Sequence, residues 1–318
     1  MMKRRIGILL LLLCLGLSYI QCYAHAASSE SAVEAIVPER ACTLAISYCY
    51  DGVAFFDTPV KLYKIADVSA DCRYNLTSSF ADSLLVINGV RTQGEWDVIR
   101  TTLEAYILAN NIQPDRTIVT NVNGQAYFED LETGLYLVAV GEVAQGDLRC
   151  YFASALVALP GLGTDGYWQY EVEVNAKAEM LPSVDPDESI DLKVLKLWKG
   201  DEGRNDRPES VQIEIFRNGV SYETVVLSDE NHWCYSWSAK DDGANWMVME
   251  RDVPVGYLMT VEERETSFTV TNTLDTAEPP DDAPDTGDTF NLLLPILLLG
   301  ISGSALLLFG IAGKRNEQ

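Results

Sequence analysis

The chain has 318 residues, 47% of them hydrophobic, which allows two ordinary domains with packed cores and excludes global disorder. Its 23 basic and 47 acidic residues give a formal net charge of −24, which disfavours a nucleic-acid partner, because phosphate contacts need clustered Lys and Arg. Two histidines and the absence of zinc-like Cys/His spacing give little basis for a turnover enzyme, so we expect no enzymatic activity, no metal and no cofactor.

The first 26 residues have the composition of a secretory signal peptide. Basic residues at positions 3–5 precede an apolar stretch from Ile6 to Leu17, and the sequence Ala-His-Ala at 24–26 is a small-x-small cleavage site. We therefore expect the mature chain to begin at Ala27, with a loose leader over residues 27–39.

Residues 40–180 have the pattern of a β-sandwich domain with one helical insertion. The segments "ACTLAISYCY", "PVKLYKIA", "AYFEDL", "GLYLVAVG", "YFASALVAL" and "YWQYEVEVNA" favour strands. A helix is expected over about 94–110, where Thr92 and Glu95 can form a capping box. Apolar residues then recur at helical spacing: Trp96, Ile99, Leu103, Tyr106 and Ile107.

Several of these segments resemble the N-terminal domains of sortase-assembled pilins. The resemblance is carried, in order, by "PVKLYKIADV", "FEDLETGLYLVAV", "YFASALVALP" and "YWQYEVEV". The stretch "WQYEVEVNAK" is similar to the pilin motif Trp-x-x-x-Val-x-Val-Tyr-Pro-Lys, with Asn175 and Ala176 in place of Tyr and Pro. The resemblance implies that Lys177 accepts the threonine of the next subunit. Strand parity places Lys177 opposite the apolar face, and the alternative is an ordinary solvated lysine.

The mature chain keeps five cysteines, an odd number that leaves at least one unpaired. Export permits disulfides. Cys72 and Cys150 lie in polar stretches of the first domain and are a candidate pair, although connectivity does not follow from sequence.

A linker rich in proline and acidic residues, "LPSVDPDES" at 181–189, leads to a second domain over residues 190–275. Its first strand, "DLKVLKLWK", places Lys196 in the same row as apolar residues, because side chains alternate along a strand. That row contains Ile190, Leu192, Val194 and Trp198.

Two further polar residues occupy inward positions of this domain. Glu250 continues the row of Trp246 and Val248, and Asn272 continues the row of Phe268 and Val270. Burial disfavours charge, so a neutral Lys196 amine could attack the Asn272 carboxamide while a protonated Glu250 polarises it, with release of ammonia and formation of an isopeptide bond. The alternative is a buried Lys–Glu ion pair with an asparagine beside it.

The second domain resembles a Cna B-type domain, a prealbumin-like β-sandwich of Gram-positive surface proteins. The resemblance is carried by "KLWKGDEGRNDRPESVQIEIFRNG", "VVLSDENHWCYSW", "WMVMERDVPVGY" and "FTVTNT". It implies an isopeptide bond between Lys196 and Asn272, assisted by Glu250. The first domain has no lysine in its first strand and has Ala139 where a glutamate would be expected, so we predict no such bond there.

Residues 276–289 are a stalk rich in Pro and Asp, followed by an apolar segment at 290–313 and a basic tail at 314–318. The apolar segment is long enough to span a bilayer. Within the stalk, Ala283-Pro284-Asp285-Thr286-Gly287 resembles the sorting signal Leu-Pro-x-Thr-Gly of Gram-positive surface proteins. The resemblance implies sortase cleavage after Thr286; the alternative is an ordinary single-pass membrane protein.

These features together predict an all-β structural protein, most simply a pilin subunit, covalently attached to the cell wall from a single-pass membrane precursor. The expected partners are a sortase and either a peptidoglycan precursor or another pilin subunit. The alternative function is a monomeric adhesin that binds a host protein or glycan through its N-terminal domain. Contact with the membrane is expected only through the C-terminal segment before sorting.

Overall fold

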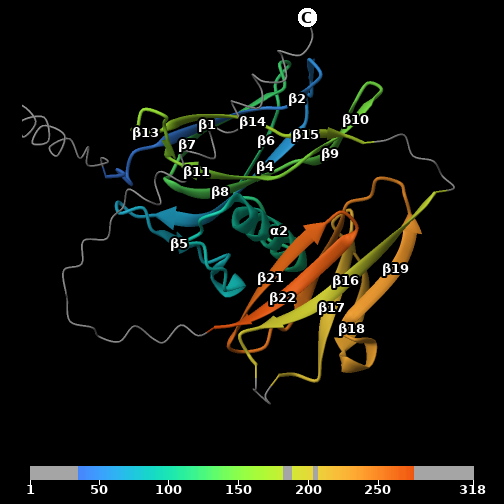
Figure 1. Cartoon of the computed structure of the whole chain (residues 1–318). Helices are drawn as coiled ribbons and strands as arrows, with labels where there is room; N and C mark the ends of the chain where they lie inside the picture. Colours follow the sequence, from blue (N-terminus) through green and yellow to red (C-terminus); the bar gives the residue numbers. More distant parts are fainter. Residues whose placement is uncertain (1–34, 182–187, 203–206, 276–318) are drawn as a thin grey trace, which may run out of the picture. The chain divides into compact units, whose positions relative to one another are not determined.

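A computed structural model describes residues 35–181, 188–202 and 207–275 (Figure 1). Strands dominate these residues, which confirms the predicted all-β class, and α2 (Gln93–Ala109) is the single α-helix among them. The predicted signal peptide, sorting sequence, membrane segment and cytoplasmic tail lie outside the described residues. Within the described ranges, no helix has the length and apolar composition needed to cross a membrane.

The N-terminal β region, defined here as residues 35–181, contains strands β1 to β15 and the short 3-10 helix η1 (Ala81–Ser83). Its main sheets have the strand orders β14-β1-β7, β15-β10-β9 and β11-β8-β4-β5, with β6 paired to β4. The strand bounds are β1 Cys42–Ser47, β2 Cys49–Tyr50, β3 Val53–Ala54, β4 Pro59–Val68, β5 Tyr74–Leu76, β6 Arg116–Val119, β7 Gln125–Leu131, β8 Gly134–Ala139, β9 Gly141–Gln145, β10 Leu148–Phe152, β11 Ala155–Leu159, β12 Gly161–Leu162, β13 Trp168–Gln169, β14 Glu171–Asn175 and β15 Ala178–Met180.

The sheet containing β4 and β8 is covered on both faces. Leu62 and Val138 contribute to one apolar cluster together with Leu44 of β1, whereas Ile65 and Leu137 contribute to a second cluster with Leu103 of α2. A strand buried on both faces has a continuous apolar sequence instead of an alternating one. This explains why "GLYLVA" in β8 is apolar throughout.

Helix α2 begins where the sequence predicts. The Thr92 side chain accepts a hydrogen bond from the Glu95 backbone N–H, and the Glu95 carboxylate accepts one from the Thr92 backbone N–H. This reciprocal pair satisfies two of the N–H groups that a helix start leaves without partners. The predicted helical insertion over about 94–110 is therefore confirmed.

Helix α2 also contacts strand β21 (Tyr257–Arg264) on its other side. The Thr102 hydroxyl lies 2.9 Å from the backbone nitrogen of Val261, from which it accepts a hydrogen bond. Ala105 belongs to the apolar cluster of the C-terminal strands, and Arg251 donates to the Ala109 carbonyl at the end of the helix. A helix covered on two sides needs apolar or small residues on both, and α2 has them.

The C-terminal sandwich, defined here as residues 188–275, consists of a four-stranded sheet β19-β16-β22-β21 and a three-stranded sheet β18-β17-β20 (Figure 1). Val194, Val261 and Phe268 from the first sheet share one apolar cluster with residues of the second. The remaining element bounds are β16 Ser189–Lys199, β17 Ser210–Arg217, β18 Val220–Ser228, η2 (a 3-10 helix) Asp229–Asn231, β19 Cys234–Lys240, β20 Trp246–Arg251 and β22 Ser267–Leu274.

The segment "YFASALVAL" differs from its predicted single strand. It forms the end of β10 and all of β11, which belong to different sheets. Ala153 and Ser154 separate the two strands, and the Ala153 backbone N–H donates to the Lys177 carbonyl. The chain changes sheet here without a glycine or proline, so the sequence offers no turn signal at this point.

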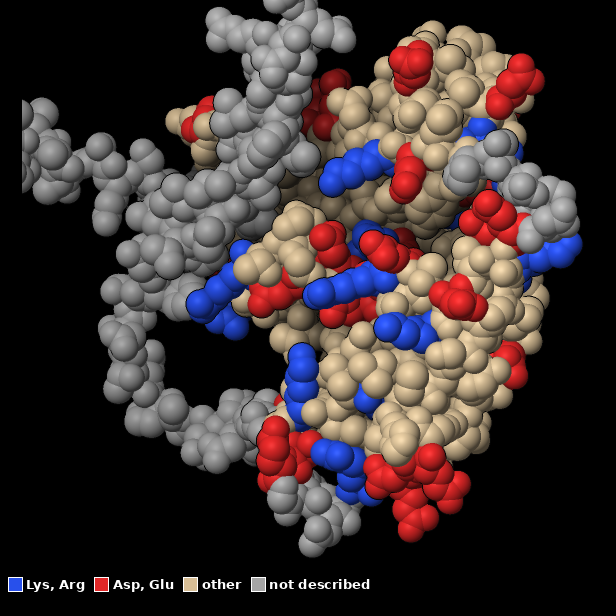
Figure 2. All heavy atoms as spheres, turned by 45° about the vertical axis from the view of Figure 1, so that its right-hand side comes forward, with Lys and Arg blue, Asp and Glu red and all other residues tan. Residues whose placement is uncertain are grey.

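Charged side chains of both signs share the surface. Figure 2 shows, on the face that it presents, Lys and Arg interspersed with Asp and Glu, with no single basic patch gathered there. Ion pairs of partly exposed residues include Arg149–Glu142 and Arg264–Glu262.

Candidate functional site

Three strands of the C-terminal sandwich carry the polar residues that strand parity places inward. Lys196 lies on β16 and Asn272 on β22, which are parallel neighbours in one sheet. Asn272 is opposite Trp198 in this register, two positions along from Lys196 and on the same face, which is within reach of a long side chain. Glu250 lies on β20 in the other sheet.

The three side chains are fully buried and meet at Glu250. Lys196, Glu250 and Asn272 have exposed fractions of 2%, 2% and 0%. The Lys196 Nζ lies 3.1 Å from Glu250 Oε2, and Asn272 Nδ2 donates to Glu250 Oε1 at 2.9 Å. The carboxylate of one sheet therefore bridges the amine and the carboxamide of the other.

Burial changes the protonation of both ionisable members. Removal from water lowers the pKa of Lys196 to about 8, an effect that the neighbouring Glu250 only partly opposes. The same removal from water raises the pKa of Glu250, against the lowering effect of Lys196 and Asn272. Both shifts favour the neutral forms, so the site can hold a free amine beside a protonated carboxyl group.

Within the part of the chain that the structure describes, the carboxamide oxygen of Asn272 has neither a hydrogen bond nor an ion pair. Among the described residues, no group donates a hydrogen bond to the buried Asn272 Oδ1. A half-turn of the carboxamide about its Cβ–Cγ bond exchanges Oδ1 with Nδ2 and brings Oδ1 against Glu250, where a protonated carboxyl group can donate to it. The geometry thus accommodates a carboxyl group that polarises the Asn272 carbonyl.

Four residues around Lys196 were not singled out by sequence reasoning for this site. The Lys196 Nζ lies 4.4 Å from the centre of the Trp198 ring. Arg207 lies 5.1 Å from the same centre and forms two hydrogen bonds with Asp201, which also accepts one from Tyr257. Asp201 and Arg207 lie outside the strands, so they have no periodic signal; the inward parity of Trp198 is the one available indication.

The family comparison matches this part of the chain. Residues 192–273 match the family described as "Cna protein B-type domain". The chain contains a Cna B-type domain. The matched segment includes Lys196, Glu250 and Asn272, so all three lie inside the Cna B-type domain and not at its margins.

Solved structures that align with the chain include a bacterial surface protein and two pilins. A single B repeat unit of the collagen-binding surface protein Cna of Staphylococcus aureus aligns with 12% identity and a TM-score of 0.26, covering 74% of this chain and 98% of that one. The major pilin SpaD of Corynebacterium diphtheriae aligns with 14% identity and a TM-score of 0.28, covering 75% of this chain and 66% of that one.

A backbone pilin of Streptococcus pyogenes aligns with 12% identity and a TM-score of 0.33, covering 74% of this chain and 64% of that one. The chain thus spans about two thirds of the length of these two pilins. No curated protein matches the sequence.

Lys177 lies between β14 and β15 and is exposed. Its neighbours Val172 and Val174 pack against the apolar cluster of the N-terminal β region, together with Trp168. The structure therefore leaves the Lys177 side chain open to solvent, while its use by an enzyme remains a prediction. The predicted sortase sequence, Ala283 to Gly287, lies outside the described residues.

The candidate disulfide between Cys72 and Cys150 is not formed in the structure, where both are free cysteines. Cys150 is fully buried in β10 within an apolar cluster, whereas Cys72 is partly exposed in the turn between β4 and β5. The alternation of Leu148, Cys150 and Phe152 is the signal that identifies Cys150 as a core residue.

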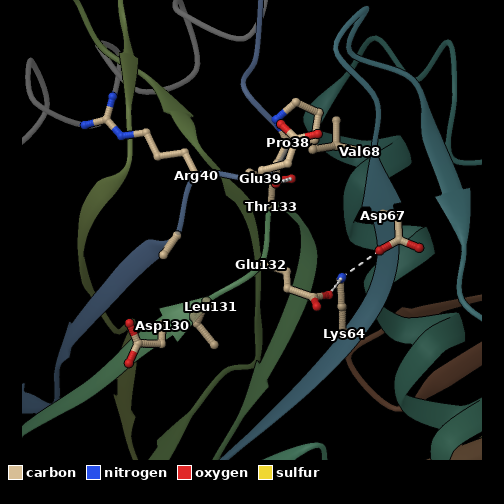
Figure 3. A pocket seen from close by; sticks show the side chains of 11 residues that line it. Pro38, Glu39, Arg40, Lys64, Asp67, Val68, Asp130, Leu131, Glu132 and Thr133 are labelled. Atoms are coloured by element: carbon tan, nitrogen blue, oxygen red, sulfur yellow. Dashed lines mark hydrogen bonds and ion pairs between the residues drawn. The ribbon is translucent and has the colours of Figure 1, made fainter.

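A hollow of about 430 Å³ lies in the N-terminal β region, near the beginning of the described chain (Figure 3). Its lining includes Arg40, Asp130 and Lys64. Figure 3 shows the Lys64 amine directed at Asp67 and Glu132, with which it forms ion pairs. Ligand sites are commonly apolar with a few converging polar groups, whereas charged side chains form much of this lining and three of them, Lys64, Asp67 and Glu132, pair with one another.

Proposed function

We propose that the chain is a structural protein of the bacterial surface, of pilin type, whose Cna B-type domain cross-links itself through an isopeptide bond between Lys196 and Asn272. The observation that carries the proposal is the buried contact of Glu250 with both residues. The neutral forms favoured by burial are the reactive forms for this chemistry.

The reaction needs no reagent from outside the site. A proton moves from the Lys196 ammonium to Glu250, and the free amine attacks Cγ of Asn272 while Glu250 hydrogen-bonds Oδ1. Glu250 then carries a proton from the attacking nitrogen to Nδ2, the Cγ–Nδ2 bond breaks and ammonia leaves. One amine and one primary amide become one secondary amide and ammonia, so the protein acts once on itself and does not turn over.

The position of the bond gives it a mechanical role. It would join the first strand of the Cna B-type domain to the last, and these strands are parallel neighbours. A pull on the two ends of the domain would then load a covalent bond, and the hydrogen bonds between β16 and β22 would be spared. This is a suitable property for a protein that holds a cell to a surface.

The attachment step rests on the sequence of the C-terminal part. We infer that a sortase cleaves between Thr286 and Gly287 and passes the Thr286 carbonyl to an amine of a peptidoglycan precursor or of another subunit. The mature protein would lie at the cell surface, covalently bound to the wall, after a single-pass precursor stage. In a polymer, the exposed Lys177 would be the acceptor amine.

The alternative of a monomeric adhesin, with a host protein or glycan bound by the N-terminal β region, has less support. The hollow near Arg40 is a candidate binding site for it, and Lys64 at its edge is already paired. We therefore favour the structural role.

Mass spectrometry of the full chain tests the cross-link. The wild-type chain should be lighter than its sequence mass by one ammonia molecule, and digestion should yield a branched peptide that joins Lys196 to Asn272. Lys196→Ala should have the full sequence mass, and Lys193→Ala, at an exposed position of the same strand, should still lose ammonia. A wild-type chain with its full sequence mass would overturn the proposal.

Cells expressing the chain test the polymer. Covalent multimers in wall extracts that disappear in Lys177→Ala and persist in Lys193→Ala would support a pilin subunit. One wall-linked species of monomer size would instead support the adhesin.

A further inference from the structure

A compact ion pair lies just after strand β16. Gly200, at φ 73°, turns the chain so that Asp201 follows immediately. The Asp201 carboxylate accepts two hydrogen bonds from Arg207, at 2.9 and 2.7 Å, and a third from the Tyr257 hydroxyl at 2.9 Å. Two-point contacts between an arginine and a carboxylate fix the orientation of both groups.

The two partners differ in exposure. The Asp201 side chain is 1% exposed, whereas the Arg207 side chain is 38% exposed. Two hydrogen bonds from Arg207 and one from the Tyr257 hydroxyl hold the buried carboxylate in a fixed position. The Arg207 side chain lies between this carboxylate and solvent.

The Trp198 ring contacts both this ion pair and the reactive amine. Its ring centre is 5.1 Å from the Arg207 guanidinium and 4.4 Å from the Lys196 Nζ. Tyr257 and Trp233 contact the same ring edge-on, with centre-to-centre distances of 5.2 and 5.5 Å. Cation–π and edge-to-face contacts of this kind hold an aromatic ring in one orientation.

We propose that Asp201 and Arg207 act as a clamp that holds the Trp198 ring against the Lys196 amine, closing the site to water and fixing the direction of attack on Asn272. The inference rests on the proposed cross-link and adds two positioning residues to it. Neither residue touches the reacting carboxamide in this role; both position the amine through Trp198.

The clamp also has an electrostatic signature that a purely structural role lacks. Among the residues that the structure describes, the charged groups that act on Lys196 are Glu250 from β20 and the pair Asp201 and Arg207, which follow β16 in the chain; β22 supplies the neutral Asn272. The positive charge of Arg207 lowers the pKa of Lys196, and the negative charge of Asp201 raises it. Removal of one partner should therefore shift the pH profile of the reaction in the direction set by the charge that remains.

Refolding of the full chain measures the rate of cross-linking. The chain is dissolved in denaturant before the bond forms. Dilution of the denaturant into a detergent solution starts folding. Samples are then quenched at intervals, and their intact mass is measured. Arg207→Gln and Asp201→Asn should each lose ammonia about tenfold more slowly than wild type, because small misplacements of reacting groups cost at least this much. The pH of half-maximal rate should rise in Arg207→Gln and fall in Asp201→Asn. The double variant should recover the wild-type pH profile but remain slow.

Two further variants complete the test. Arg264→Gln removes an arginine from an exposed ion pair of the same domain and should react at the wild-type rate. Arg207→Lys keeps the charge but not the two-point contact, so it should keep the wild-type pH profile with a reduced rate, and it serves if Arg207→Gln does not fold.

The outcomes separate the two proposals. Wild-type rates and unshifted profiles in all folded clamp variants would overturn the clamp and leave the cross-link intact. A wild-type chain that never loses ammonia would overturn the cross-link, and the clamp with it.

Discussion

Replacement of Lys196 by methionine should strongly destabilise the Cna B-type domain. Methionine preserves the apolar stem of lysine but has no amine, so no cross-link can form. Glu250 can stay neutral without its partner because burial raises its pKa, so the substitution leaves no unpaired charge in the core. The main loss is therefore that of the covalent bond.

The size of the loss follows from the loop that the bond closes. Positions 196 and 272 enclose a loop of about 77 residues, and the chain-entropy relation for cross-links assigns such a loop roughly 4–5 kcal/mol at 25 °C. For a domain of this size, each kcal/mol moves the unfolding midpoint by several degrees, so we expect a decrease of roughly 20–30 °C.

Calorimetric or circular-dichroism melting of the full chain measures this difference. Lys193→Met, at an exposed position of the same strand, is the matched control and should melt with the wild type. Equal midpoints for wild type and Lys196→Met, with a wild-type chain that has lost ammonia, would refute the view that the bond stabilises the fold.

Three other predictions concern protonation, hydrogen bonding and thiols. The Asn272→Ala variant cannot cross-link, and its free energy of unfolding should rise as pH increases from about 8 to 10.5. Over this range the folded chain has released the Lys196 proton that the unfolded chain still holds. Chemical denaturation at a series of pH values measures this rise. Thr102→Val should cost about 1–3 kcal/mol in denaturant unfolding, because it leaves a backbone N–H of β21 without its acceptor. A thiol reagent should label exposed Cys49 quickly in the native chain and buried Cys150 only after unfolding.

Each of these tests has a control and a contradicting result. In the double variant Lys196→Met with Asn272→Ala, the rise of stability with pH should be reduced, and an unchanged rise would assign it to another group. Thr117→Val, at an exposed position of β6, should leave stability nearly unchanged; a cost equal to that of Thr102→Val would contradict the hydrogen-bond argument. Native labelling of Cys150 at the rate of Cys49 would contradict its burial.

The sequence was most informative where periodicity and local hydrogen bonding act together. The start of α2 follows from Thr92 and Glu95 alone, because a capping box is a local interaction. The inward positions of Lys196, Glu250 and Asn272 follow from alternation along three separate strands. Alternation gives the face of a strand but not its neighbours, so their meeting at one carboxylate required the topology of the two sheets.

Other features had no periodic signal to follow. The Asp201–Arg207 pair comes from residues outside the strands, where side-chain direction depends on individual backbone angles such as that of Gly200. The change of sheet between β10 and β11 occurs at Ala153 and Ser154, which do not mark a turn. Cys150 lies in a polar stretch of the sequence, although its alternation with Leu148 and Phe152 indicates the core.

The contact of Thr102 with Val261 has a consequence for how copies of this protein tolerate crowding. Strand β21 is the last strand on its side of the four-stranded sheet, and an uncovered last strand can pair with a strand of another molecule. Helix α2 lies along it and occupies a backbone N–H that such pairing would use. Chains packed densely beside one another can therefore touch at this flank without their sheets merging into aggregates.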